Sequence, residues 1–175
     1  VPRFARSSRF VVRVFGVILS FLVISGLIVN FVFTFAPLQQ TSAKLAAVTS
    51  ADARCPTLSA LRPIAKLPPG VVFTFVDLGP RLIAMTPHKA ITGPYHRNGD
   101  AILDVYHVFR GSPEVARPII RAHHSDYVLI CVNSPEATNH RKAARNGLYA
   151  RLEKGLAPDW LTSVNLPADS AYRLW

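Results

Sequence analysis

The sequence predicts an α/β fold in which one N-terminal transmembrane helix is followed by a small α/β domain with a mixed sheet. Three observations support this prediction. Residues 14–43 contain no charged side chain. Two short runs, 71–76 and 127–132, are rich in β-branched and aromatic residues, which is typical of buried strands. Segments with apolar residues at helical spacing alternate with these strands, which favours a sheet covered by helices.

The composition excludes several classes of protein. The chain has 175 residues, of which 50% are hydrophobic and 17% charged, so it has enough apolar side chains for a folded core. Two cysteines are too few for a disulfide-dense scaffold or a four-cysteine zinc site. Lysine and arginine number 20 against 10 acidic residues, which gives a net charge of +10. Such an excess is typical of proteins that meet nucleic acids or anionic membranes.

The charge-free segment predicts an uncleaved transmembrane helix over residues 14–36. About 20 apolar residues span a bilayer as a helix, and this run is longer than the roughly 7–15 apolar residues of a cleavable signal peptide. A buried core helix is the other alternative, but the run lacks the polar stripe expected there. Four arginines precede the span, whereas the first cation after it is Lys44; the four are Arg3, Arg6, Arg9 and Arg13.

This asymmetry of charge predicts the topology through the positive-inside rule. We expect a basic cytoplasmic N-terminus over 1–13, a helix in the inner (cytoplasmic) membrane, and a periplasmic C-terminal domain. The first residue is Val. A first residue other than Met has three explanations, which stay open. The chain is a processed product, it starts at an alternative start codon, or it is the tail of a longer polytopic protein.

The positive charge outside the membrane is scattered. Removing the four N-terminal arginines from the net +10 leaves +6 on the remaining residues. These cations form no basic stripe interleaved with aromatic residues, so we expect no nucleic-acid partner. A solvated surface, or attraction to anionic lipid headgroups or glycans, explains them instead.

The predicted domain follows a linking segment. Residues 37–69 are expected to form a tether with short helices, and residues 70–175 the extracytoplasmic α/β domain. Its first strand over 71–76 is followed by a short helix over 81–85 and a second strand over 89–92.

Helices and strands then continue to alternate. Apolar residues at helical spacing predict an amphipathic helix over 99–110, and Ser112-Pro113 begins another helix that runs towards His123. After the strand at 127–132, Ser134-Pro135 begins a further helical segment, with Asn146-Gly147 as a candidate break and Gly155 as its end. The segments 160–166 and 171–175 are predicted to be closing strands.

A cluster of polar residues near the first two strands is the candidate ligand site. Asp77 directly follows a strand, where open α/β sheets place their sites. Arg97 offers a planar fork suited to phosphate or carboxylate. We therefore interpret the cluster as a site for an anion or a sugar phosphate, formed by Asp77, His88, Tyr95, His96, Arg97 and Asn98. In the alternative interpretation Asp77 caps the next helix and the loop side chains satisfy buried backbone groups.

Other kinds of chemistry have little support in the sequence. The six histidines lack the spacing of a zinc site, so no metal or cofactor is expected. A Gly-x-Ser-x-Gly elbow and a phosphate-binding glycine loop are both absent from the sequence. Cys55 and Cys131 are predicted to form a disulfide, which would stabilise the fold by about 4 kcal/mol on the chain-entropy model. The competing picture has Cys131 as a small buried residue and Cys55 as a free thiol.

The order of motifs resembles a known family. A strand, Asp-Leu-Gly-Pro, a short helix, Thr-Pro-His, a strand, Gly-Pro-Tyr-His-Arg-Asn, a helix pair and Asp-Tyr-Val follow one another in residues 70–131. This order resembles the last membrane helix and C-terminal extracytoplasmic domain of certain uncharacterised bacterial polytopic membrane proteins. Those are similar to GT-C glycosyltransferases, including the oligosaccharyltransferase catalytic subunit. That subunit holds its acceptor peptide with a Trp-Trp-Asp-Tyr-Gly motif, whose Asp and Gly match Asp77 and Gly79.

The resemblance implies a function and a set of partners. GT-C enzymes carry their catalytic acids in a first extracytoplasmic loop that these residues lack, so the chain is expected to be a non-catalytic part of a lipid-linked sugar transferase. The expected partners are the lipid bilayer, a lipid-linked sugar or glycan, and other membrane helices. Two alternatives stay open: a single-span envelope protein that binds or scaffolds, and the periplasmic domain of a transporter.

Overall fold

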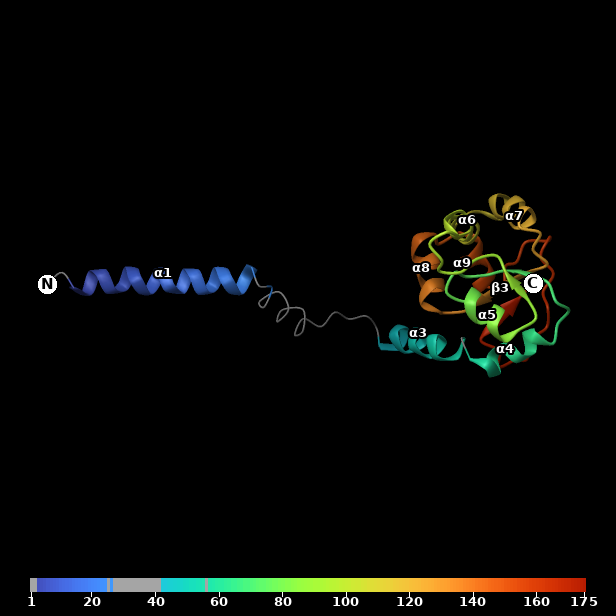
Figure 1. Cartoon of the computed structure of the whole chain (residues 1–175), viewed down its shortest axis with the longest axis horizontal. Coiled ribbons are helices and arrows are strands. Elements are labelled where there is room, and N and C mark those ends of the chain that lie inside the picture. The colour runs from blue at the N-terminus through green and yellow to red at the C-terminus, as the bar shows by residue number, and fades with distance from the viewer. Residues whose placement is uncertain (1–2, 25, 27–41, 56) are drawn as a thin grey trace. The chain divides into compact units, whose positions relative to one another are not determined.

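The computed structural model describes residues 3–24, 26, 42–55 and 57–175 (Figure 1). They fall into two compact units, Val1–Ser42 and Ala43–Trp175. The domain start at residue 70 stays a prediction. Helix α4, Leu58–Ala65, buries Leu61 and Ile64 completely in the core of the second unit, so the folded part begins upstream of the first strand.

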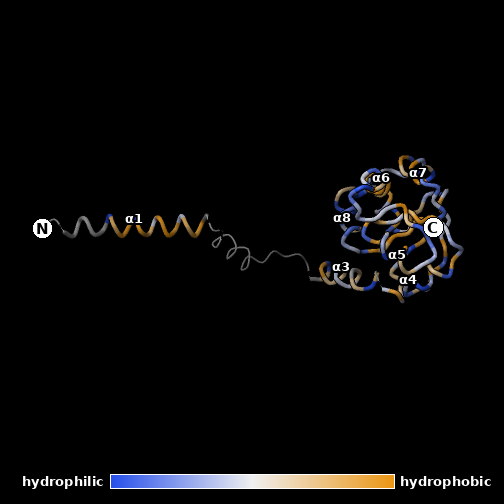
Figure 2. The backbone as a smooth tube through the Cα atoms, in the orientation of Figure 1, coloured by the Kyte–Doolittle hydropathy of each residue, from blue (hydrophilic) through white to orange (hydrophobic). Residues whose placement is uncertain are grey.

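The first unit contains helix α1, Arg3–Ile24. Figure 2 colours most of the later turns of α1 as hydrophobic, and Phe15, Val17 and Phe21 are 71%, 70% and 66% exposed. Of the predicted span over 14–36, residues 14–24 lie in this helix, while 25 and 27–36 lie outside the described residues. In the described part of the chain, no helix reaches the combined length and hydropathy of a bilayer crossing.

The second unit is built on a sheet of four strands, and this sheet is mixed, as the sequence predicts. Its strands are β1 (Val71–Phe73), β2 (Lys89–Ala90), β3 (Tyr127–Cys131) and β4 (Tyr172–Leu174). They are arranged in the order β2-β1-β3-β4. The first three strands are parallel, and β4 runs antiparallel to β3. The carboxyl ends of β1, β2 and β3 therefore share one edge of the sheet.

Helices connect and cover these strands. Besides α4 they are α3 (Ser42–Arg54), α5 (Gly79–Met85), α6 (Gly99–Arg110), α7 (Pro113–Ala122), α8 (Pro135–Ala143) and α9 (Leu148–Glu153). In Figure 1, α6 and α7 lie on one side of β3 and α4 on the other. The predicted helix over 99–110 is confirmed by α6, and Pro118 is accommodated within α7.

An aromatic cluster joins the sheet to α6 and α9. Phe73 and Phe75 project from β1 and its continuation, and both contact Phe109 of α6, with ring centroids 5.9 and 4.8 Å apart. Phe75 also contacts Tyr149 of α9 at 5.8 Å. Residues two apart on an extended segment share a face, which explains why both phenylalanines meet the same helix.

Several predicted strands are shorter than expected. The strand predicted over 89–92 ends at Ala90, and two others are shortened for local physical reasons. The strand expected over 71–76 ends at Phe73, because the chain turns and the N–H of Leu78 donates to the Phe75 carbonyl. The segment 160–166 forms only an isolated bridge, Val164 with Leu174, because a turn closed by Leu161 N–H and Pro158 carbonyl takes up its start.

Candidate functional site

A crevice lies at the carboxyl edge of the sheet between β1 and β3. The chain leaves β1 for β2 on one side and later enters β3 on the other, so this is the topological switch point, where open α/β sheets bind ligands. The crevice has a volume of about 90 Å³. Its lining comes from the segments that follow α3 and β1, from the end of β3 and from the start of α8. It consists of Cys55, Phe75, Asp77, Leu78, Cys131, Ser134, Pro135 and Glu136.

Glu136 holds the loop that carries Asp77. Its Oε1 accepts the N–H of Val76 and its Oε2 accepts the N–H of Asp77, each at 3.0 Å. Glu136 is only 9% exposed. It stands in the first turn of α8, whose N-cap residue Ser134 accepts the N–H of Ala137 at 3.2 Å. A bidentate, charge-assisted pair of this kind fixes the loop against α8.

Asp77 itself is exposed at the mouth of this crevice. The N-cap residue of α5 is Leu78, which makes no side-chain capping bond. Gly79 follows, and a Cβ atom there would lie 1.9 Å from the backbone carbonyl oxygen of Thr92. The chain after β2 therefore packs directly against the chain after β1, which requires glycine at this position.

A disulfide forms one wall of the crevice. Cys55, at the end of α3, is bonded to Cys131, at the end of β3, with the two Cα atoms 6.2 Å apart. These are the two cysteines that the sequence analysis pairs. The hydroxyl of Tyr172 donates to the carbonyl oxygen of Cys55 from β4. Three segments far apart in the sequence are thus tied together beside Asp77.

The structure brings the loop over 95–98 to the same edge as Asp77. The side-chain amide of Asn98 donates to Thr92 Oγ1 at 3.0 Å, which anchors the loop to the segment that contacts Gly79. Tyr95, His96 and Arg97 are exposed on this loop. No described contact assigns them a ligand, and their role stays a prediction.

His88 lies away from this group, at the opposite edge of the sheet. It is 3% exposed, its Nδ1 accepts the N–H of Gly70 at 3.2 Å, and its Nε2 donates to the Ile64 carbonyl at 2.9 Å. Its ring meets that of Tyr127 edge-on at 5.5 Å. Both ring nitrogens are therefore engaged in joining α4 to the sheet.

Glu136 and His140 are the site-shaping residues that the sequence analysis missed. His140 is fully buried among Phe75, Tyr106 and Phe109, with ring centroids 5.4–5.5 Å away. Its Nε2 lies 3.5 Å from Glu136 Oε1 without hydrogen-bond geometry. The Ser-Pro-Glu sequence predicts a helix start, yet nothing local indicates that Glu136 reaches a loop 60 residues earlier in the chain.

Comparisons with known proteins were made for the whole chain. No family model matches the sequence, and no curated protein matches it. In structure, the chain is similar to the C-terminal globular domain of an oligosaccharyltransferase from Archaeoglobus fulgidus. The TM-score is 0.49 at 13% sequence identity, and the match covers 67% of this chain and 91% of the other. Among the residues that the structure describes, no three His, Cys, Asp or Glu side chains gather as metal ligands.

Proposed function

We propose that this chain is a membrane-anchored, non-catalytic extracytoplasmic part of a GT-C-like lipid-linked sugar transferase, and that its crevice helps to hold the acceptor. The observation that carries the proposal is the position of Asp77. It stands at the carboxyl end of the central parallel strand, on a loop fixed by Glu136. In the family that the sequence resembles, the Asp at this position helps to hold the acceptor peptide.

The chemistry of the crevice suits binding by a carboxylate. Asp77 is exposed, whereas Glu136, the other carboxylate of the crevice lining, is buried. A preformed carboxylate can accept N–H or O–H groups from a ligand with little reorganisation, because its loop does not have to be ordered on binding. Phe75 and Leu78 supply apolar surface beside it.

Two further observations support the proposed location. Disulfides persist in oxidising compartments such as the bacterial periplasm, and Cys55 is bonded to Cys131. The charge-free run over 14–36 follows four arginines, which favours a cytoplasmic N-terminus and a periplasmic domain. A periplasm-active reporter fused after Trp175 should be active, whereas activity of a cytoplasmic reporter there would contradict the location.

The function can be tested in membranes of cells that express the full-length gene. Deleting the gene should increase the pool of lipid-linked sugars and reduce glycan transfer, both measured by mass spectrometry. Restoring the gene with Asp77→Asn should leave the pool high, while the exposed control Asp159→Asn should restore it to wild type. If deletion changes neither quantity, the transferase proposal fails and a scaffold role takes its place.

A further inference from the structure

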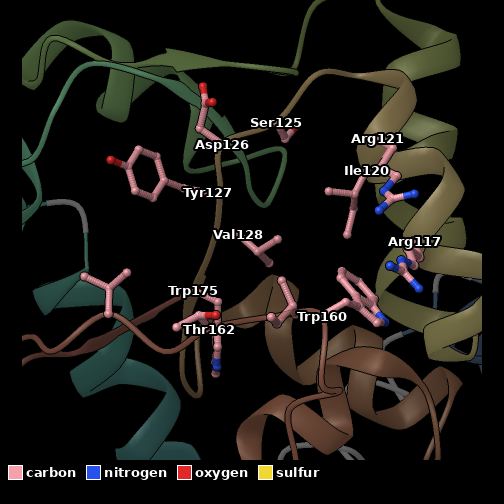
Figure 3. Close-up of a pocket in the computed structure, with 12 residues that line it drawn as sticks. Arg117, Ile120, Arg121, Ser125, Asp126, Tyr127, Val128, Trp160, Thr162 and Trp175 are labelled. Carbon is pink, nitrogen blue, oxygen red and sulfur yellow. The ribbon is translucent and has the colours of Figure 1, made fainter.

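A second, larger cavity lies at the amino edge of the sheet, opposite the Asp77 crevice. It has a volume of about 440 Å³, within the range of about 300–1,000 Å³ typical of small-molecule sites. Helix α7, the start of β3, the segment 160–164 and Trp175 form its walls. Figure 3 shows Arg117 and Arg121 projecting from α7 on one side, with Asp126 and Tyr127 on the other.

Two arginines and one carboxylate line the cavity, so its lining carries a net positive charge. Arg117 and Arg121 are one helical turn apart on α7 and therefore lie on the same face, where like charges repel. Neither guanidinium has an ion pair or hydrogen bond to any described residue. The one carboxylate in the lining, Asp126, accepts the N–H of Val71 at 2.8 Å. An anion bound between the two arginines would relieve their repulsion.

The rest of the lining is aromatic and apolar. Trp160 is partly exposed, and Trp175, Ile120 and Val128 are buried beneath the cavity. Both tryptophans of the chain thus contribute to this one site. The negative face of an indole ring attracts the weakly positive C–H groups on one face of a sugar ring, in addition to the apolar area that such a contact buries.

We propose that this cavity binds a saccharide that carries a carboxylate or phosphate group. The guanidinium forks of Arg117 and Arg121 would hold the anionic group in bidentate hydrogen bonds, and Trp160 would pack against the sugar ring. The exposed hydroxyl of Thr162 and the unused lone pairs of Asp126 remain for the sugar hydroxyls. This inference uses different residues from the Asp77 crevice and stands without the proposed function.

The test is calorimetric titration of the full chain in detergent micelles with four probes. Trigalacturonate carries carboxylates, glucose 1-phosphate carries a phosphate, maltotriose is a neutral sugar, and inorganic phosphate lacks the ring. We expect one of the two charged sugars, or both, to bind, and maltotriose to bind at least about tenfold more weakly, because charged hydrogen bonds contribute about 1.5–3 kcal/mol. The tighter of the first two probes identifies the anionic group.

Variants then assign the binding to this cavity. Arg117→Ala and Trp160→Ala should each lower the affinity for the charged sugar about tenfold or more. The exposed control Arg145→Ala should leave that affinity unchanged. If Arg117→Ala does not fold, Arg121→Gln replaces it, because glutamine removes the charge but keeps a polar side chain at this exposed position. The titration overturns the proposal if no sugar binds or if maltotriose binds as tightly as the charged sugars. It also does so if inorganic phosphate binds as tightly as glucose 1-phosphate. The variants overturn the proposal if those in the cavity bind the charged sugar as tightly as the control does.

Discussion

Replacing Glu136 by glutamine tests whether its carboxylate holds the loop of Asp77. The wild-type side chain accepts two backbone N–H groups, from Val76 and Asp77, at 3.0 Å each. Glutamine has the same shape but only one acceptor oxygen, and its NH₂ group would face the second N–H. One of the two backbone N–H groups would then lose its hydrogen-bond acceptor, beside a residue, Glu136, that is only 9% exposed.

The size of the effect follows from the two contacts. A hydrogen bond to a charged group contributes about 1.5–3 kcal/mol, and Glu136→Gln removes one such bond and neutralises the other. We therefore expect the free energy of unfolding to fall by about 2–4 kcal/mol, since the second bond weakens towards the roughly 1 kcal/mol of a neutral pair. Glu136→Ala leaves both N–H groups unpaired and should cost at least as much.

The assay is urea unfolding of the full chain, followed by tryptophan fluorescence. Trp160 and Trp175 are the only tryptophans in the sequence and both lie in the unit Ala43–Trp175, so the signal reports on that unit. The control is Asp159→Asn, which removes an exposed carboxylate in the same unit. A change below about 0.5 kcal/mol for Glu136→Gln, as for an ordinary surface substitution, would refute the role given to this carboxylate.

Three further predictions concern the same unit, and urea unfolding measures each of them. The double variant Cys55→Ala/Cys131→Ala should lose about 4 kcal/mol, because the bond closes a loop with a sequence separation of 76; equal stability of the two proteins would contradict this. Gly79→Ala should cost about 3 kcal/mol or more, because its Cβ would lie 1.9 Å from a backbone oxygen, whereas Gly99→Ala, with nothing within 4 Å, should be neutral or slightly stabilising. Burial raises the pKa of the Tyr172 hydroxyl above its ordinary value near 10. The contribution of this hydroxyl to the free energy of unfolding is therefore complete below about pH 10 and is lost as the pH rises further. The unfolding free energy should therefore fall above about pH 10, and more gently in Tyr172→Phe; identical slopes would count against this assignment.

Sequence patterns predict a helix or a strand correctly where residues close together in the chain cause that element to form. The helix over 99–110 follows from apolar residues at helical spacing, and α6 occupies that range. The apolar run that begins at Tyr127 contains β3, whose last four residues are buried. Ser134-Pro135 begins α8 because the serine hydroxyl caps it and proline fits its first turn. Each of these features depends on residues within a few positions of one another.

The candidate site depends on contacts that no local pattern contains. His88 resembles the other polar residues of its neighbourhood in sequence, yet Gly70 and Ile64 take both of its nitrogens and draw it to the far edge of the sheet. Glu136 resembles an ordinary first-turn glutamate, but the chain folds so that Val76 and Asp77 present their N–H groups to it. The register of β1 against β3 creates these contacts, and the register is a property of the whole sheet.

The two candidate sites lie at opposite ends of β3. We expect little electrostatic coupling through solvent between them, so that binding at one site should not change the affinity of the other. A strand rises about 3.3 Å per residue, so the five residues of Tyr127–Cys131 separate the cavity of Arg117 from the crevice of Asp77 by about 16 Å. That is about twice the Debye length of roughly 8 Å at physiological ionic strength, which leaves little direct electrostatic coupling between the two. Variants at the two ends should therefore combine additively. Any measurable coupling would have to pass along β3 itself. The disulfide at Cys131 fixes this strand at the crevice end, and the backbone hydrogen bonds between Val128 and Trp175 fix it at the cavity end.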